Sequence, residues 1–134
     1  YAERLAVEAG LLRDPYEQIG SLQSELFRAA RLVVDTGLHS KKWTREKAII
    51  YMMDNAGEVR SESESEIERY IVWPGQATSY MIGRIKIMEL RERAKAELGN
   101  RFNIKDFHSV VLMNGILPLT VLEALVDQYI KENS

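Results

Sequence analysis

The sequence predicts an all-α protein with about seven helices in an irregular orthogonal array or bundle. Apolar residues recur at steps of three and four along most of the chain. Helix caps, glycines and prolines divide it into segments with short loops. No run of four or more residues alternates apolar and polar side chains with β-branched enrichment, as a half-buried strand would. At 134 residues and 46% hydrophobic content, the chain predicts a single helical domain over 1–134.

The first helix is expected at the very start of the chain. Residues 1–8 favour a helix, and Gly10 is placed to close it. No Ser, Thr, Asp or Asn precedes Tyr1 to cap the first free N–H groups. A helix that begins uncapped in mid-pattern predicts that the chain is a fragment of a longer protein.

The second helix is expected to open at Asp14-Pro15, with proline at the first helical position. Its apolar residues recur at steps of three and four, which predicts one buried stripe. The stripe consists of Ile19, Leu22, Leu26, Ala29 and Val33. Thr36-Gly37 is the predicted stop of this helix.

The next two helices are predicted from their capping residues. Thr44 is placed to cap a helix that ends at Asn55-Ala56-Gly57. Ser61-x-x-Glu64 has the spacing of a capping box, which would open a short acidic helix reaching about Ile71.

Pro74-Gly75 breaks the chain sharply after this acidic helix. Three further helices are expected, over about 76–98, 103–114 and 118–131, since a glycine, an asparagine and a proline mark their limits.

Composition excludes several classes of protein. Eighteen Lys and Arg against twenty Asp and Glu give a net charge of −2, whereas nucleic-acid binding favours a basic excess. Cysteine is absent, and no apolar run approaches the length of a membrane span. His39 and His108 are too far apart in sequence to form a zinc motif on one helix. We therefore expect no metal ligand in this chain.

One acidic stretch could suggest a calcium loop, but it lacks the Asp/Asn alternation and central glycine of an EF-hand. Carboxylates near a helix N-terminus are favoured by the helix dipole, so a solvated helix start is the plainer interpretation. The stretch comprises Glu58, Glu62, Glu64, Glu66 and Glu68.

Asp35 lies near a predicted helix end, where a negative charge opposes the helix dipole. Arg31 precedes it by four residues and His39 follows it by four. An aspartate that holds an arginine could also orient the imidazole for hydrogen bonding or proton transfer. The alternative is a helix-end ion pair with an unrelated turn histidine.

The segment around the predicted break is a second candidate for chemistry. N–H groups in the first turn after Pro74-Gly75 would favour an anion or a developing oxyanion. Gln76, Tyr80 and Gly83 share one helical face, and the Tyr80 hydroxyl could donate to a carbonyl oxygen that gains charge. The alternative is a buried tyrosine bonded to a backbone carbonyl, with Gly83 as a packing contact.

An ordered series of motifs gives the sequence a resemblance to a known family. The series is Tyr-Ala-Glu-Arg-Leu at 1–5, Asp14-Pro15-Tyr16, Arg31 to His39, Arg69-Tyr70, Pro74-Gly75-Gln76-Ala77, Tyr80, Leu90-Arg91 and Phe107-His108. With these motifs nearly the whole chain resembles the C-terminal part of the bacterial family called domain of unknown function eight-eight-five.

The resemblance implies a fold similar to gluzincin metallopeptidases, of which this chain would be the C-terminal helical half. A zinc motif and a later glutamate ligand would lie upstream, so zinc is expected in the full-length parent and not in this fragment. The implied partners are the missing N-terminal part of the same protein and a peptide or small amide substrate. Family resemblance also suggests a periplasmic or lipid-anchored location, with a cytoplasmic one left open.

The resemblance further implies roles for individual residues in the intact protein. Tyr80 and His39 would donate hydrogen bonds to the transition state. Contacts with substrate would come from Arg69, Tyr70 and Gln76. Residues that support the site would be Glu3, Arg31, Asp35, Pro74, Gly75 and Gly83. The alternative function is a non-catalytic helical module that binds a protein or peptide in a groove.

Overall fold

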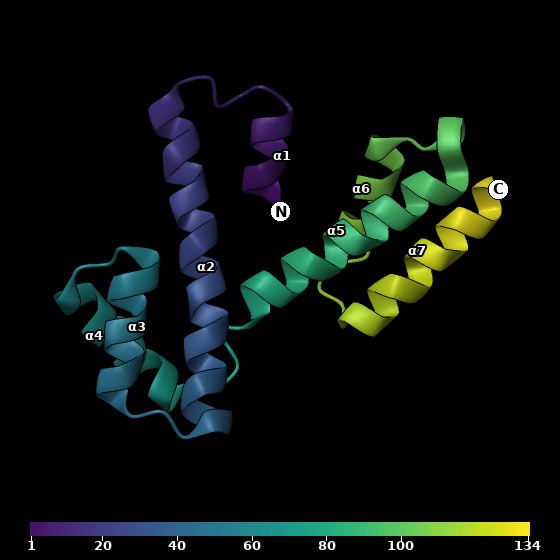
Figure 1. Cartoon of the computed structure of the whole chain (residues 1–134). Helices are drawn as coiled ribbons and strands as arrows, with labels where there is room; N and C mark the ends of the chain where they lie inside the picture. The colour runs from purple at the N-terminus through teal and green to yellow at the C-terminus, as the bar shows by residue number, and fades with distance from the viewer. The chain divides into compact units, whose positions relative to one another are not determined.

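The computed structural model describes all residues, 1–134, and contains helices and no strands (Figure 1). Seven α-helices and one short 3-10 helix follow one another along the chain. They are α1 (Ala2–Glu8), α2 (Pro15–Lys41), α3 (Arg45–Ala56), α4 (Arg60–Val72), α5 (Ser79–Leu98), η1 (Gly99–Arg101), α6 (Ile104–Leu112) and α7 (Leu119–Asn133). The predicted all-α class and the count of seven helices are confirmed.

The helices form two compact units, Tyr1–Ile82 and Gly83–Ser134. The boundary falls within α5, so this helix contributes its first residues to one unit and the rest to the other. The single domain expected over 1–134 stays a prediction.

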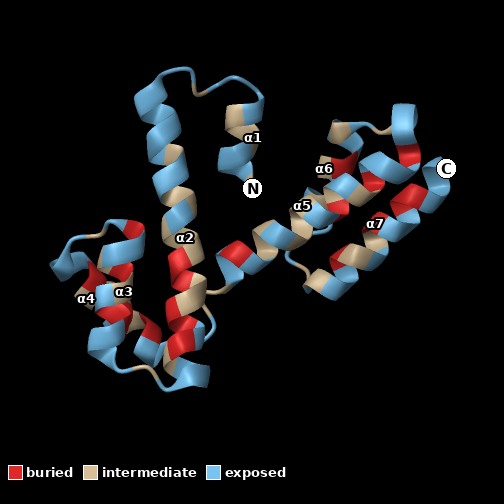
Figure 2. Ribbon diagram, in the orientation of Figure 1, coloured by how far each residue is buried: buried red, intermediate tan, exposed pale blue.

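The core of the first unit lies between the C-terminal half of α2 and the helices α3 and α4 (Figure 2). Its largest fully buried side chains are Tyr70, Ile49, Met52, Ile67 and Val34. Burying such a side chain contributes about 1.5–3 kcal/mol, so this packing holds the three helices together.

The N-terminal half of α2 does not take part in that core (Figure 2). Ile19, Leu22 and Leu26 are 60%, 59% and 50% exposed, although their spacing predicts burial. The prediction was wrong for these three because α3 and α4 pack only against the later turns of α2, where Ala30 and Val34 are buried.

Several predicted helix ends are confirmed by their hydrogen bonds. The Asp14 carboxylate accepts from the Tyr16 N–H, and Glu17 accepts from the Asp14 N–H, which makes a reciprocal cap with Pro15 at the first helical position. The Thr44 hydroxyl accepts from the Lys47 N–H at the start of α3. Gly57 ends α3 with φ of 70°, in the left-handed region that favours glycine.

The predicted stop at Thr36-Gly37 was wrong, because α2 continues to Lys41. Gly37 is needed for close packing instead. A Cβ placed on it would lie 2.6 Å from the Trp43 ring, closer than carbon atoms can approach. The helix ends at Lys42, which adopts φ of 54°, and His39 therefore lies on the helix one turn beyond Asp35.

Two predicted helix starts also differ from the structure. Ser61 lies inside α4, which begins at Arg60 without a side-chain cap. The Arg60 guanidinium pairs with Glu64 and with Glu46 of α3, so tertiary contacts hold this end. Gln76 belongs to the turn before α5, which begins only at Ser79.

The second unit packs the later turns of α5 with α6 and α7. Its buried side chains include Leu90, Leu98, Phe107, Val126 and Ile130. Asn103 caps α6 as predicted, by accepting from the Lys105 N–H. None of the helices in either unit combines the length and apolar character needed to cross a lipid bilayer.

Candidate functional site

Arg31 is a buried cation on the core side of α2, with only 7% of its surface exposed. Three aromatic rings surround its guanidinium, with centroids 4.5 Å (Tyr80), 5.4 Å (Tyr70) and 5.6 Å (Phe27) from Cζ. No carboxylate pairs with it, and its Nε atom is buried without a hydrogen-bond partner. The rings stabilise the charge by about 0.5–2 kcal/mol each, but they do not neutralise it.

Gln76 joins Arg31 to a second arginine. Its Oε1 atom accepts from Arg31 Nη2 at 3.1 Å and from Arg69 Nη1 at 3.0 Å. Two guanidinium groups thus converge on one neutral oxygen. Sequence analysis placed Gln76 and Arg69 together as substrate contacts, and the structure brings them together.

Glu66 is the carboxylate that pairs with Arg69. It accepts from Arg69 Nη2 at 2.6 Å and from the Tyr70 hydroxyl. Burial pushes the pKa of Glu66 upward, but the hydrogen bonds from Tyr70 and Arg69 outweigh burial and lower it below its usual value. Burial and the bond to Glu66 raise the pKa of the Tyr70 hydroxyl. Tyr70 is therefore a neutral donor to Glu66 in the core.

Tyr80 covers the Arg31 guanidinium while remaining 46% exposed. A third arginine, Arg28, lies with Cζ 6.0 Å from the centre of the Tyr80 ring and pairs with Glu3 of α1 at 3.0 Å. Glu3, predicted to support the site, therefore reaches it through Arg28. The alternative of a buried Tyr80 bonded to a backbone carbonyl is not what the structure shows.

We call these residues the arginine cluster. It comprises Arg28, Arg31, Glu66, Arg69, Tyr70, Gln76 and Tyr80, all within the first compact unit. Arg28 is balanced by Glu3 and Arg69 by Glu66, whereas Arg31 has no such partner. Arg31 is therefore a buried cation without an ion pair, beneath a partly exposed tyrosine and a partly exposed arginine.

Asp35 does not hold Arg31, contrary to the expected pairing. Its buried carboxylate accepts from the Gly75 N–H at 3.0 and 3.2 Å, and its Oδ1 lies 3.7 Å from His39 Nε2. The Gly75 N–H, which precedes the first-turn N–H groups expected to favour an anion, is therefore occupied by the protein's own carboxylate. This contact anchors the turn that carries Gln76 to α2.

His39 contacts the arginine cluster only through the backbone of Tyr70. Its Nε2 atom bonds the Tyr70 carbonyl oxygen at 3.0 Å, and because that oxygen only accepts, Nε2 donates. Arg31 and His39 are eight residues apart on α2, or about 12 Å of helical rise. The structure thus does not bring His39 together with Tyr80. Gly83 makes no close contact either, since a Cβ placed on it meets no atom within 4 Å.

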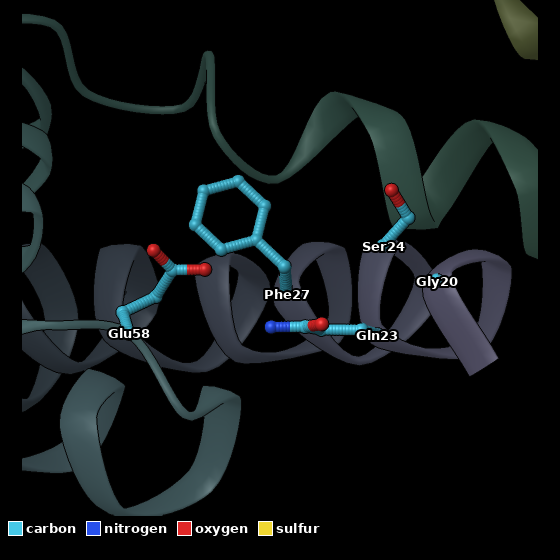
Figure 3. Close-up of a pocket in the computed structure, with 5 residues that line it drawn as sticks. All are labelled: Gly20, Gln23, Ser24, Phe27 and Glu58. Atoms are coloured by element: carbon cyan, nitrogen blue, oxygen red, sulfur yellow. The ribbon is translucent and has the colours of Figure 1, made fainter. Parts of the chain in front are cut away.

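A shallow hollow of about 210 Å³ opens beside the cluster, where Phe27 of α2 faces Glu58 (Figure 3). Gly20, Gln23 and Ser24 complete its lining. A neighbouring hollow of about 280 Å³ is lined by Phe27, Glu58, Glu62, Ser65 and Glu66. Burial and the neighbouring Glu62 raise the pKa of Glu58. The expected solvated helix start thus holds for only part of the acidic stretch, because Glu66 belongs to the cluster.

The chain offers no site that fits a zinc ion. No three His, Asp or Glu side chains are grouped so as to hold a metal ion. The two histidines belong to different compact units. We therefore derive no chemical step through a metal in this chain.

Sequence reasoning missed Glu66 as a member of the cluster and Phe27 as one of the rings around Arg31. Local signals for both were present. Phe27 precedes Arg31 by four residues, and Glu66 precedes Arg69 by three and Tyr70 by four, which places each set on one helical face. Nothing in the local sequence indicates that Arg31 lacks an ion pair, because Asp35 follows it by four residues, a spacing at which the two side chains could pair.

The chain is similar to known bacterial proteins over most of its length. The family model described as "Bacterial protein of unknown function (DUF885)" matches residues 1–126. A solved structure described as that of the putative lipoprotein from Colwellia psychrerythraea is 52% identical, with a TM-score of 0.94. The similarity covers 96% of this chain and 22% of that protein. No curated protein matches the chain.

Proposed function

The chain belongs to the bacterial DUF885 family, whose function is unknown, and we propose that it is the helical portion of a zinc metallopeptidase-like protein. It would supply walls of the cleft and hydrogen-bond donors, while the metal ligands would lie elsewhere in the protein. The observation that carries the proposal is the arginine cluster, where Tyr80 and Arg69 reach the surface above the buried charge of Arg31.

Tyr80 is the proposed hydrogen-bond donor to the substrate. Its hydroxyl would donate to the carbonyl oxygen of a peptide or small amide as that oxygen gains negative charge. Arg69, Tyr70 and Gln76 would position the substrate, with Tyr70 acting through Glu66. His39 would act as a second donor, and Pro74, Gly75 and Asp35 would hold the turn that positions Gln76.

The proposal also covers the cellular location. The relative from Colwellia psychrerythraea is described as a "putative lipoprotein", and this chain is similar to 22% of its length. By that similarity we propose a periplasmic or lipid-anchored location for the whole protein. Fractionation of cells that express the whole protein tests this, and recovery in the cytosol would contradict it.

The experiment for the activity uses the whole protein and a set of acetylated peptides. We expect hydrolysis that a chelator abolishes and zinc restores. Tyr80→Phe should lower kcat by roughly 100-fold, since removal of one oxyanion donor has an effect of this size. Tyr16→Phe is the matched control, because Tyr16 is 84% exposed at the start of the same unit. Circular dichroism checks that both variants are folded.

The peptidase proposal is wrong if the whole protein hydrolyses none of these peptides with zinc present. If hydrolysis occurs but Tyr80→Phe leaves kcat unchanged, the role of Tyr80 is wrong while the peptidase class stands. His39→Gln is measured in the same assay, and an unchanged kcat would show that His39 is not the second donor.

A second candidate, a non-catalytic interaction module, is favoured by the exposed apolar stripe on α2. Ile19, Leu22 and Leu26 lie on one face and are each at least half exposed, a pattern typical of an interaction surface. Under this alternative a protein or peptide partner binds in the presence of a chelator, and Leu22→Glu abolishes that binding. Zinc-dependent hydrolysis by the whole protein would instead support the peptidase.

A further inference from the structure

We propose that the arginine cluster binds a carboxylate group of the substrate, with Arg69 and Arg31 as the cationic pair that recognises it. This inference deepens the proposed function, because it names the chemical class of the ligand at the same site. It rests on three features of the cluster that are independent of any family resemblance.

The first feature is the lack of an ion pair for Arg31. This residue is 93% buried, and a buried guanidinium needs an anion or a full set of hydrogen bonds, since removing a charge from water costs several kcal/mol. Arg31 has one hydrogen bond, to a neutral amide, and its Nε donor has no partner. Arg28 and Arg69, which are less buried, are each paired with a glutamate.

The second feature is the convergence of two arginines on one oxygen. Arg31 and Arg69 donate to Gln76 Oε1 over 3.1 and 3.0 Å. Guanidinium groups prefer carboxylate oxygens, which accept stronger, charge-assisted bonds. The Gln76 amide oxygen thus occupies the position that a carboxylate oxygen would take between the two groups.

The third feature is access from solvent. The Arg69 side chain is 35% exposed and Tyr80 is 46% exposed, so an entering ligand can meet both. A shift of the Tyr80 ring, which has no hydrogen bond within the arginine cluster, would open the face of Arg31 that it covers.

The geometry of the guanidinium groups favours a carboxylate. Arg28 pairs with Glu3 and Arg69 with Glu66, whereas Arg31 has no carboxylate within ion-pair distance. The nearby Asp35 carboxylate accepts from the Gly75 N–H instead. A carboxylate supplies one negative charge and two oxygens in a plane, which matches the guanidinium fork.

The test compares a peptide acid with its amide. Acetyl-dialanine, which ends in a carboxylate, and acetyl-dialaninamide, which ends in a neutral amide, are titrated into the whole protein by calorimetry. A chelator is present throughout, so that no metal-dependent hydrolysis can occur. We expect the acid to bind at least tenfold more tightly than the amide.

Two substitutions in α4 locate the binding. Arg69→Gln should weaken binding of the acid about tenfold or more, because it removes a charge-assisted bond. Arg60→Gln is the matched control, since Arg60 is an arginine of the same helix that pairs with glutamates outside the cluster. It should leave binding unchanged. Arg31→Lys is a second test, because lysine keeps the buried positive charge but lacks the planar, forked N–H donors of the guanidinium group.

Each outcome decides the inference separately from the peptidase proposal. Equal binding of acid and amide, no binding of either, or unchanged binding in Arg69→Gln would overturn it. Stronger binding of inorganic phosphate than of acetyl-dialanine would overturn the assignment to a carboxylate. Selective binding of the acid by a protein that hydrolyses no peptide would support this inference while removing the proposed function.

Discussion

Glu66 shows how a single carboxylate can join an arginine and a buried tyrosine of its own helix, α4. It accepts hydrogen bonds from Arg69 and from the Tyr70 hydroxyl, and Tyr70 is 1% exposed in the core. Burial alone would favour the protonated acid. The two donors reverse that preference, so the charged form of Glu66 stabilises the folded chain.

The lowered pKa of Glu66 predicts a particular pH dependence of stability. A carboxyl whose pKa is lower in the folded than in the unfolded state stabilises the fold above its unfolded value, about 4.3, and loses this contribution as pH falls through its folded value. Glu66→Gln should therefore cost about 1–2 kcal/mol at pH 7, and the difference from the natural chain should shrink below about pH 4.

Urea unfolding followed by tryptophan fluorescence measures this, because Trp43 and Trp73 both belong to the first compact unit. Glu68→Gln is the matched control in the same helix, as Glu68 forms an exposed pair with Arg45. It should cost under about 1 kcal/mol. A difference between Glu66→Gln and the natural chain that stays constant from pH 7 to pH 3 would contradict the assigned role.

At the scale of the element, α2 contains two glycines with opposite roles. Gly20 lies in the exposed half, where an added Cβ would meet no atom within 4 Å. Gly37 lies against Trp43, which also packs on Tyr51 of α3 with ring centroids 5.5 Å apart. Gly20 weakens the helix and has no packing role, whereas Gly37 leaves room for the Trp43 ring.

Alanine at each position should therefore change stability in opposite directions. Gly37→Ala should destabilise the first unit by about 1–3 kcal/mol, because the Trp43 ring must move. Gly20→Ala should stabilise it by about 0.5–1 kcal/mol, because alanine loses less backbone entropy in a helix. Urea unfolding of both variants measures the two effects, and destabilisation of equal size at both positions would show that the contact with Trp43 is unimportant.

At the scale of the whole molecule, the chain has two hydrophobic cores. One contains Ile49, Met52 and Ile67, and the other contains Phe107 and Val126. Because each core is assembled from its own helices, the two units should respond separately to a change in one of them.

Phe107→Ala tests this separation. Loss of a fully buried phenylalanine should cost the second unit about 3–5 kcal/mol. Amide hydrogen exchange should accelerate in residues 83–134 and change little in residues 1–82. Met113→Ala is the control, because Met113 is 83% exposed. Equal acceleration throughout the chain would show that it unfolds as one cooperative unit.

The exposed stripe on α2 also belongs to this scale. Ile19, Leu22 and Leu26 follow the spacing of a buried face, yet each is at least half exposed, although Leu22 lines a hollow with Val7 of α1. The similar protein from Colwellia psychrerythraea is much longer, since the match covers 22% of it. The spacing of these three residues thus predicts a burial that the structure does not show.

The sequence alone determined the helical class and most helix limits. Asp14, Thr44, Gly57 and Asn103 act within one or two turns of their own position, so their effect depends on neighbours that the sequence already displays. Gln76 and Arg69, which the family resemblance groups as substrate contacts, are also close in sequence, seven residues apart.

Only the tertiary structure decided how the charged residues pair and what the glycine at 37 does. Asp35 stands four residues from Arg31, but its carboxylate bonds Gly75, forty residues away, and Arg31 bonds Gln76, forty-five residues away. Helical spacing states which partners are within reach. The packing of α2 against α4 and the following turn determines which partner each charged group bonds, because a buried charged group can bond only the polar groups that surround it.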